Sequence, residues 1–130
     1  MFVRASSTPH ARLLRAIDRG NLQLVRLAAV ECERIDLETA LRILLLLERA
    51  EPATYERAAV RWAGRLLEAR PQLGFAGGAG VLDGLDGLSG PDRAVAASRL
   101  ALALRRLGEP RAAIVLERDG ARPPRPPEKP

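Results

Sequence analysis

The fold is decided by residues 35–70, IDLETALRILLLLERAEPATYERAAVRWAGRLLEAR, which predict two helices joined by a tight turn. The first is predicted over Leu37–Ala50, because Asp36 is a good N-cap residue. Its apolar side chains cover an arc of about 200° at roughly 100° per residue. An arc of that width predicts contact with more than one neighbour, so we expect Leu37–Ala50 to be the central helix.

The second helix is predicted over Pro52–Ala69, since proline suits the first position of a helix and Pro71 prevents its continuation. Its apolar residues recur three and four positions apart, as expected for one buried face. They are Tyr55, Ala58, Ala59, Trp62, Ala63, Leu66 and Ala69. Trp62 lies in the middle of this face and is interpreted as a core anchor, with a partly exposed binding hot spot as the alternative.

Cap and stop residues predict four further helices, over residues 9–19, 22–34, 89–107 and 110–118. Hydrophobic residues make up 47% of the chain and aromatic residues only 3%, so Leu and Ala, which favour helices, dominate. No stretch alternates with the period of two that strands require. We therefore expect an all-α fold of six or seven helices in antiparallel hairpins, arranged as a compact bundle or a short solenoid-like stack.

Residues 71–90 are rich in glycine, which costs up to about 1 kcal/mol relative to alanine inside a helix. The spacing of the apolar residues still predicts a helix over Ala79–Leu88, frayed at its start and mobile. The glycines do not form a dinucleotide-binding loop, because Asp83 stands where the third glycine belongs and no strand precedes them. A P-loop also needs a lysine, and this stretch has none.

The predicted domain organisation has three parts. Residues 1–8 form a flexible N-terminal arm, and residues 9–118 form a single helical domain. Residues 119–130 contain almost only Pro, Arg, Gly, Glu and Lys, which cannot bury apolar area, so we expect a disordered or polyproline-like tail.

The formal net charge is +5, and arginine supplies all but one of the 21 basic residues. Two helix faces carry arginines at helical spacing: Arg57, Arg61 and Arg65 on one, and Arg12, Arg15 and Arg19 on the other. We interpret the chain as a small protein-interaction or adaptor module that presents these faces to a protein partner. The alternative is a nucleic-acid-binding accessory protein that uses the same arginines. A third possibility is a helical homodimer, based on the wide apolar arc of residues 37–50.

The residue types that carry catalysis and metal binding are scarce. The chain has one histidine, His10, on the apolar face of its helix, and one cysteine, Cys32, which is too few for a triad or a zinc site. We therefore predict no enzymatic activity, no cofactor and no metal site. A single cysteine allows no disulfide framework, which favours the cytoplasm. The longest uncharged stretch, Pro71–Leu82, is shorter than the ~20 residues of a membrane span.

Two resemblances accompany this interpretation. LRRLGEPRAA, residues 104–113, resembles the turn between the helices of a tetratricopeptide unit, although the ~34-residue period of that family is absent. The start of the helix at residues 36–41 and the stretch PATYERAAVRW at residues 52–62 resemble small, uncharacterised all-helical proteins of high-GC actinobacteria. That likeness covers about residues 13–107 and departs at the glycine-rich stretch. It implies a helical fold in a bacterial cytoplasm and no particular activity, ligand or functional residue.

Overall fold

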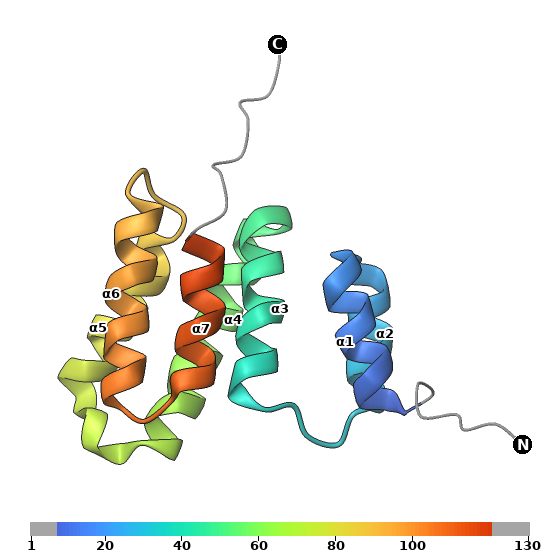
Figure 1. Cartoon of the computed structure of the whole chain (residues 1–130), viewed down its shortest axis with the longest axis horizontal. Helices are drawn as coiled ribbons and strands as arrows, with labels where there is room; N and C mark the ends of the chain where they lie inside the picture. The colour runs from blue at the N-terminus through green and yellow to red at the C-terminus, as the bar shows by residue number, and fades with distance from the viewer. Residues whose placement is uncertain (1–7, 121–130) are drawn as a thin grey trace, which may run out of the picture. The chain divides into compact units, whose positions relative to one another are not determined.

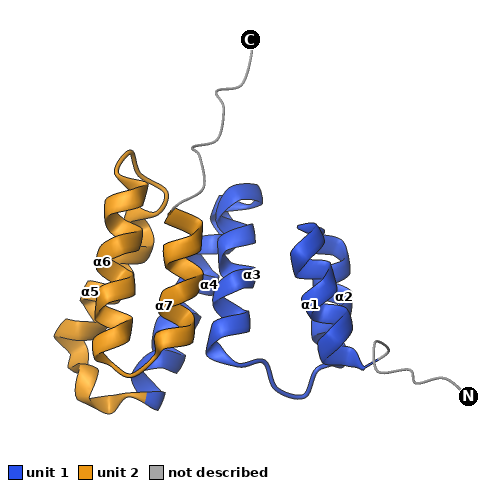
Figure 2. Cartoon of the chain, in the orientation of Figure 1, with its two compact units in different colours: residues 1–69 blue, residues 70–130 orange. Residues whose placement is uncertain are grey.

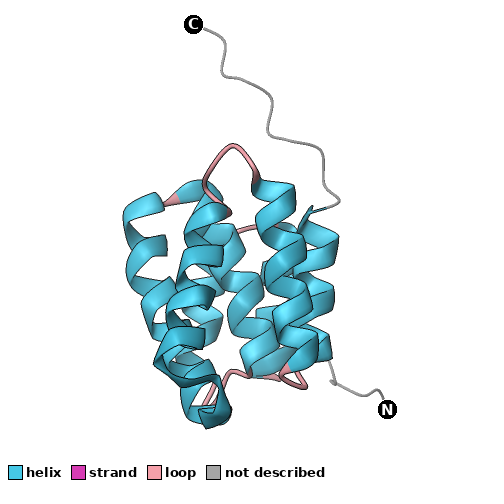
Figure 3. Cartoon of the chain, turned by 90° about the vertical axis from the view of Figure 1, so that its left-hand side faces the viewer, coloured by secondary structure: helices cyan, strands magenta, loops and turns pink. Residues whose placement is uncertain are grey.

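A computed structural model describes residues 8–120, whereas residues 1–7 and 121–130 lie outside the described part. Over residues 8–120 the chain forms seven α-helices and one 3-10 helix, with no strand (Figure 1, Figure 3). Their bounds are α1 Pro9–Arg19, α2 Leu22–Glu31, α3 Leu37–Ala50, α4 Pro52–Ala69, η2 Pro71–Leu73, α5 Gly74–Gly87, α6 Arg93–Arg106 and α7 Pro110–Gly120. The predicted all-α fold of six or seven helices is confirmed.

The chain divides into two compact units, Met1–Ala69 and Arg70–Pro130, whereas the sequence predicts a single domain over residues 9–118 (Figure 2). The division follows from local packing, because the most extensive contacts join helices that are neighbours in sequence: α1 with α2, α3 with α4, and α6 with α7. The start of the predicted tail also differs, since α7 continues through Gly120. The remaining tail residues, 121–130, and the predicted arm up to residue 7 lie outside the described residues.

The α1–α2 hairpin is closed by caps that the sequence predicts. The Thr8 hydroxyl accepts a hydrogen bond from the Ala11 N–H at 3.1 Å, and Gly20 ends α1 with a positive φ of 67°. The apolar core between the two helices consists of Leu13, Ala16, Ile17, Val25 and Ala28. The second helix ends at Glu31 rather than near residue 34, because Cys32 is extended. His10 is exposed instead of lying on the inner face of α1.

The α3–α4 hairpin has the predicted bounds, and α3 is the central helix of the first unit, in contact with α1, α2 and α4. The Asp36 carboxylate caps α3 by accepting the Thr39 N–H at 2.7 Å. Burial raises the pKa of Asp36, but the hydrogen bonds from Thr39 outweigh this and leave that pKa below its ordinary value. Trp62 is only 3% exposed, and its indole N–H donates to the Leu37 carbonyl at 3.0 Å. The core-anchor interpretation of Trp62 is thus confirmed.

In the second unit, α5 begins at Gly74, five residues before the predicted start at Ala79. Gly74 has a φ of 68°, a positive value that favours glycine and lets the chain turn from η2 into α5. The glycines also allow α5 to approach α6, since a Cβ on Gly87 would lie 2.9 Å from the Ala96 Cβ. Helix α6 begins at Arg93 rather than near residue 89, because Asp92 has a non-helical backbone.

Two glycine substitutions in α5 should have opposite effects on stability. A Cβ added at Gly80 would meet no neighbour within 4 Å, so Gly80→Ala should raise the free energy of unfolding by about 0.5–1 kcal/mol through helix propensity. Gly87→Ala should lower it by about 1–3 kcal/mol, because Ala96 would have to shift. Denaturant unfolding of both variants checks the prediction, and equal effects of the two would contradict the packing role of Gly87.

Candidate functional site

The first candidate site is a groove of about 240 Å³ between α1 and α2. The three arginines predicted from the α1 face all line it: Arg12, Arg15 and Arg19. The lining residues from α2 are apolar except for Glu31, and they include Leu24 and Leu27. The structure therefore combines one predicted arginine face with an apolar wall from the next helix.

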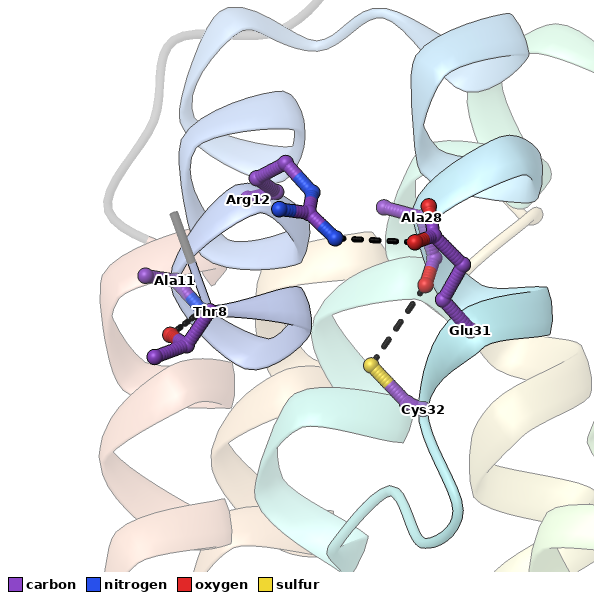
Figure 4. Close-up of polar contacts among 6 residues, drawn as sticks. All are labelled: Thr8, Ala11, Arg12, Ala28, Glu31 and Cys32. Carbon is purple, nitrogen blue, oxygen red and sulfur yellow. Dashed lines mark hydrogen bonds and ion pairs between the residues drawn. The ribbon is translucent and has the colours of Figure 1, made fainter. Parts of the chain in front are cut away.

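One ion pair crosses this groove. Arg12 donates to the Glu31 carboxylate at 2.8 Å, and Figure 4 shows the pair joining α1 to the end of α2. Both side chains are partly exposed, at 38% and 53%, so solvent screening limits the contribution of the pair to stability to about 0–1 kcal/mol. Glu31 is the only acidic residue lining the groove, against three arginines. The lining residues therefore carry more positive than negative charge.

The apolar wall extends into an exposed stripe on α2. Leu24 is 40% exposed, Leu27 67% and Val30 86%. These side chains follow one another at intervals of three residues, so they cover adjacent parts of the outer surface of α2. An exposed apolar patch beside charged residues is typical of a binding surface. We name the stripe together with Arg12, Arg15 and Arg19 the α1–α2 surface.

Sequence reasoning missed the apolar half of this surface. The sequence analysis assigns no binding role to Leu24, Leu27 or Val30, and all three are exposed in the structure. The available signal was that α2 carries apolar residues on all sides, LQLVRLAAV over residues 22–30. A hairpin buries only one face of each helix, so such a sequence leaves apolar side chains in solvent unless something else covers them.

The second predicted arginine face lies on α4, where Arg57, Arg61 and Arg65 are all exposed. Arg61 and Arg65 line another groove, of about 250 Å³ between α3 and α4, but Arg57 does not. No residue lines both this groove and the one between α1 and α2. The structure therefore places five of the six predicted arginines in two separate grooves of the first unit, and Arg57 lies outside both.

Other arginines of the first unit are neutralised by acidic residues. Arg26 makes two hydrogen bonds to the Glu51 carboxylate, at 2.6 and 2.9 Å, and this pairing lowers the pKa of Glu51 from its ordinary value. Arg42 pairs with Asp18 at 2.5 Å. By contrast, Arg19 and Arg61 form no hydrogen bond or ion pair within residues 8–120. Each of the two grooves thus has a guanidinium that no acidic side chain of this part of the chain neutralises.

Side chains that could bind a metal ion do not gather in residues 8–120, where no group of three or more His, Cys, Asp or Glu is suitably placed. Cys32 donates its thiol hydrogen to the Ala28 carbonyl, with a sulfur–oxygen distance of 3.4 Å (Figure 4). The glycine-rich stretch forms α5 and therefore has no strand-to-helix phosphate loop. None of the helices in this part of the chain combines the length and hydropathy of a membrane span.

Comparison of the chain with protein-family models, with curated proteins and with solved structures gave no match.

Proposed function

We propose that this chain is a small helical adaptor whose α1–α2 surface binds an acidic amphipathic helix of a partner protein. The observation that carries the proposal is the exposed stripe Leu24, Leu27 and Val30 beside an excess of arginine. Such a partner would place apolar side chains on the stripe and carboxylates opposite the arginines. This is the helix-in-groove mode of recognition, with arginine and carboxylate supplying specificity.

The apolar stripe favours a protein partner over the two alternatives. Nucleic-acid binding depends chiefly on phosphate contacts from basic residues, which would not require exposed leucine and valine. The homodimer alternative rests on the apolar arc of residues 37–50, and α3 already packs against α1, α2 and α4 within the chain. The single Cys32 is compatible with a reducing compartment, and the resemblance to actinobacterial proteins points to bacteria, so we propose a bacterial cytoplasm as the place of action.

The test uses a fluorescently labelled designed peptide, a helix with leucines on one face and glutamates beside them. Fluorescence anisotropy with the full chain should show saturable binding. Leu27→Asp should weaken binding by at least about tenfold, because burying one leucine contributes about 1.5–3 kcal/mol. Arg19→Gln should weaken it less and should reduce its dependence on salt.

Leu102→Asp is the matched control, since Leu102 is 51% exposed on α6, outside the α1–α2 surface. This variant should bind the peptide like the unmodified chain. Equal weakening by Leu27→Asp and Leu102→Asp would contradict the proposal. A second contradicting result would be that the chain binds a labelled DNA or RNA duplex more tightly than the peptide at low salt, and that Leu27→Asp does not change the duplex binding.

A further inference from the structure

We propose that the groove between α3 and α4 binds an aliphatic carboxylate of the fatty-acid class. Its hydrocarbon chain would lie on the apolar floor, and its carboxylate would contact Arg61 and Arg65. This site shares no lining residue with the α1–α2 surface. The inference therefore stands or fails independently of the proposed partner helix.

The floor of the groove matches a hydrocarbon chain because it offers no free polar side-chain group. Apart from the two arginines, every lining residue is apolar; they are Ile35, Ala40, Ile43, Leu44, Leu47, Ala58 and Trp62. The single polar atom among these side chains, Nε1 of Trp62, already donates to the Leu37 carbonyl. A ligand body with hydrogen-bonding groups would leave those groups unpaired on this floor, which is costly.

The size of the groove favours a single narrow chain. Its volume of about 250 Å³ lies below the ~300–1,000 Å³ of ordinary pockets for drug-sized ligands and cofactors. The lining residues of α3 run from Ala40 to Leu47, which corresponds to about 10 Å at 1.5 Å per residue. Alanine at positions 40 and 58 leaves room where larger side chains would fill the groove.

The charged end of the ligand is determined by the two arginines. Arg61 and Arg65 lie one helical turn apart on α4, and no acidic residue lines the groove. Arg65 donates to the Ile35 carbonyl at 2.5 Å, which holds its guanidinium at the edge of the groove. Arg61 forms no hydrogen bond or ion pair within the described residues. A guanidinium in this state is a suitable partner for a carboxylate, which it can bind through two hydrogen bonds.

The test uses Trp62 as a reporter, because it is the only tryptophan of the chain and lines the groove. Decanoate brominated on its chain should quench Trp62 fluorescence in a saturable manner, below its micelle concentration. Brominated decanol, which has the same chain without the charge, should bind about tenfold more weakly, because it cannot form charge-assisted hydrogen bonds to the arginines.

Arg61→Gln should weaken decanoate binding by about tenfold and leave decanol binding unchanged. Arg57→Gln is the matched control, since Arg57 is exposed on the same helix but does not line the groove, and it should change neither. Ala58→Leu should abolish quenching by filling the groove, with circular dichroism confirming that the variant is folded.

Three results would overturn the proposal. The first is quenching that does not saturate or that is equal for decanoate and decanol, which would indicate unspecific apolar contact. The second is an equal effect of Arg61→Gln and Arg57→Gln. The third is binding of a leucine- and glutamate-bearing helical peptide at Trp62 together with no binding of decanoate, which would make the groove a protein-docking surface.

Discussion

Replacing Trp62 by alanine should lower the free energy of unfolding by about 3–5 kcal/mol. The indole is 3% exposed between α3 and α4, and its removal leaves a cavity in the hairpin that contains the central helix. The substitution also removes the hydrogen bond to the Leu37 carbonyl, which joins α4 to the first turn of α3. Unfolding in denaturant, followed by far-ultraviolet circular dichroism because the only tryptophan is lost, measures the effect.

Two control variants test whether the loss of stability comes from the buried bulk of Trp62. Trp62→Phe keeps most of the apolar bulk, so it should lower the free energy of unfolding less than Trp62→Ala does. The reason is that the phenyl ring still fills part of the cavity that alanine leaves. Val60→Ala changes a side chain that is 59% exposed on the same helix, and its effect should stay within about 0.5 kcal/mol. A loss below about 1 kcal/mol for Trp62→Ala would show that Trp62 does not anchor the hairpin.

Asp119→Ala should be the most destabilising charge substitution in the second unit, at about 3 kcal/mol. The Asp119 carboxylate is 4% exposed and accepts a hydrogen bond from Arg93 at 2.6 Å. The Arg93 guanidinium also donates to the Leu88 carbonyl at 2.7 Å, so it connects α7 to the end of α5. Removing Asp119 leaves the charge of Arg93, which is only 23% exposed, without this carboxylate.

The same pair of helices provides the control for this prediction. Glu117 and Arg105 form a second ion pair between α7 and α6, at 2.7 Å, but each side chain is 44% exposed. Glu117→Ala should therefore cost less than about 1 kcal/mol in the same unfolding measurement. Replacing both members of the buried pair, Asp119→Ala with Arg93→Met, should recover part of the loss. Equal costs for Asp119→Ala and Glu117→Ala would contradict the burial argument.

The α3–α4 hairpin could be predicted to the residue because its signals are local. Asp36 caps one helix, Pro52 begins the next, and both apolar faces have helical spacing. The start of α5 could not be predicted, because glycine disfavours helices. The packing of α5 against α6 at Gly87, which favours this helix, is a tertiary contact that local sequence does not reveal. Asp119 was assigned to the tail for a similar reason, because its partner Arg93 lies 26 residues away.

The arginines of the candidate site were identified from helical spacing alone, since Arg12, Arg15 and Arg19 recur on one face of α1. The apolar stripe on α2 was missed, because periodicity cannot show which side of an all-round apolar helix is left in solvent. That choice depends on where α1 and α3 pack against α2. The separation of the groove-lining arginines into two sites, with Arg57 outside both, likewise depends on packing and has no local signal.

The most direct test of the proposed adaptor surface is an NMR titration of methyl-labelled full chain with the acidic amphipathic peptide. We predict saturable shifts of the methyl groups of Leu24, Leu27 and Val30, with Val95 and Leu102 of α6 unchanged. Shifts confined to α6, or no shifts at peptide concentrations that saturate the anisotropy signal, would contradict the assignment of partner binding to the α1–α2 surface.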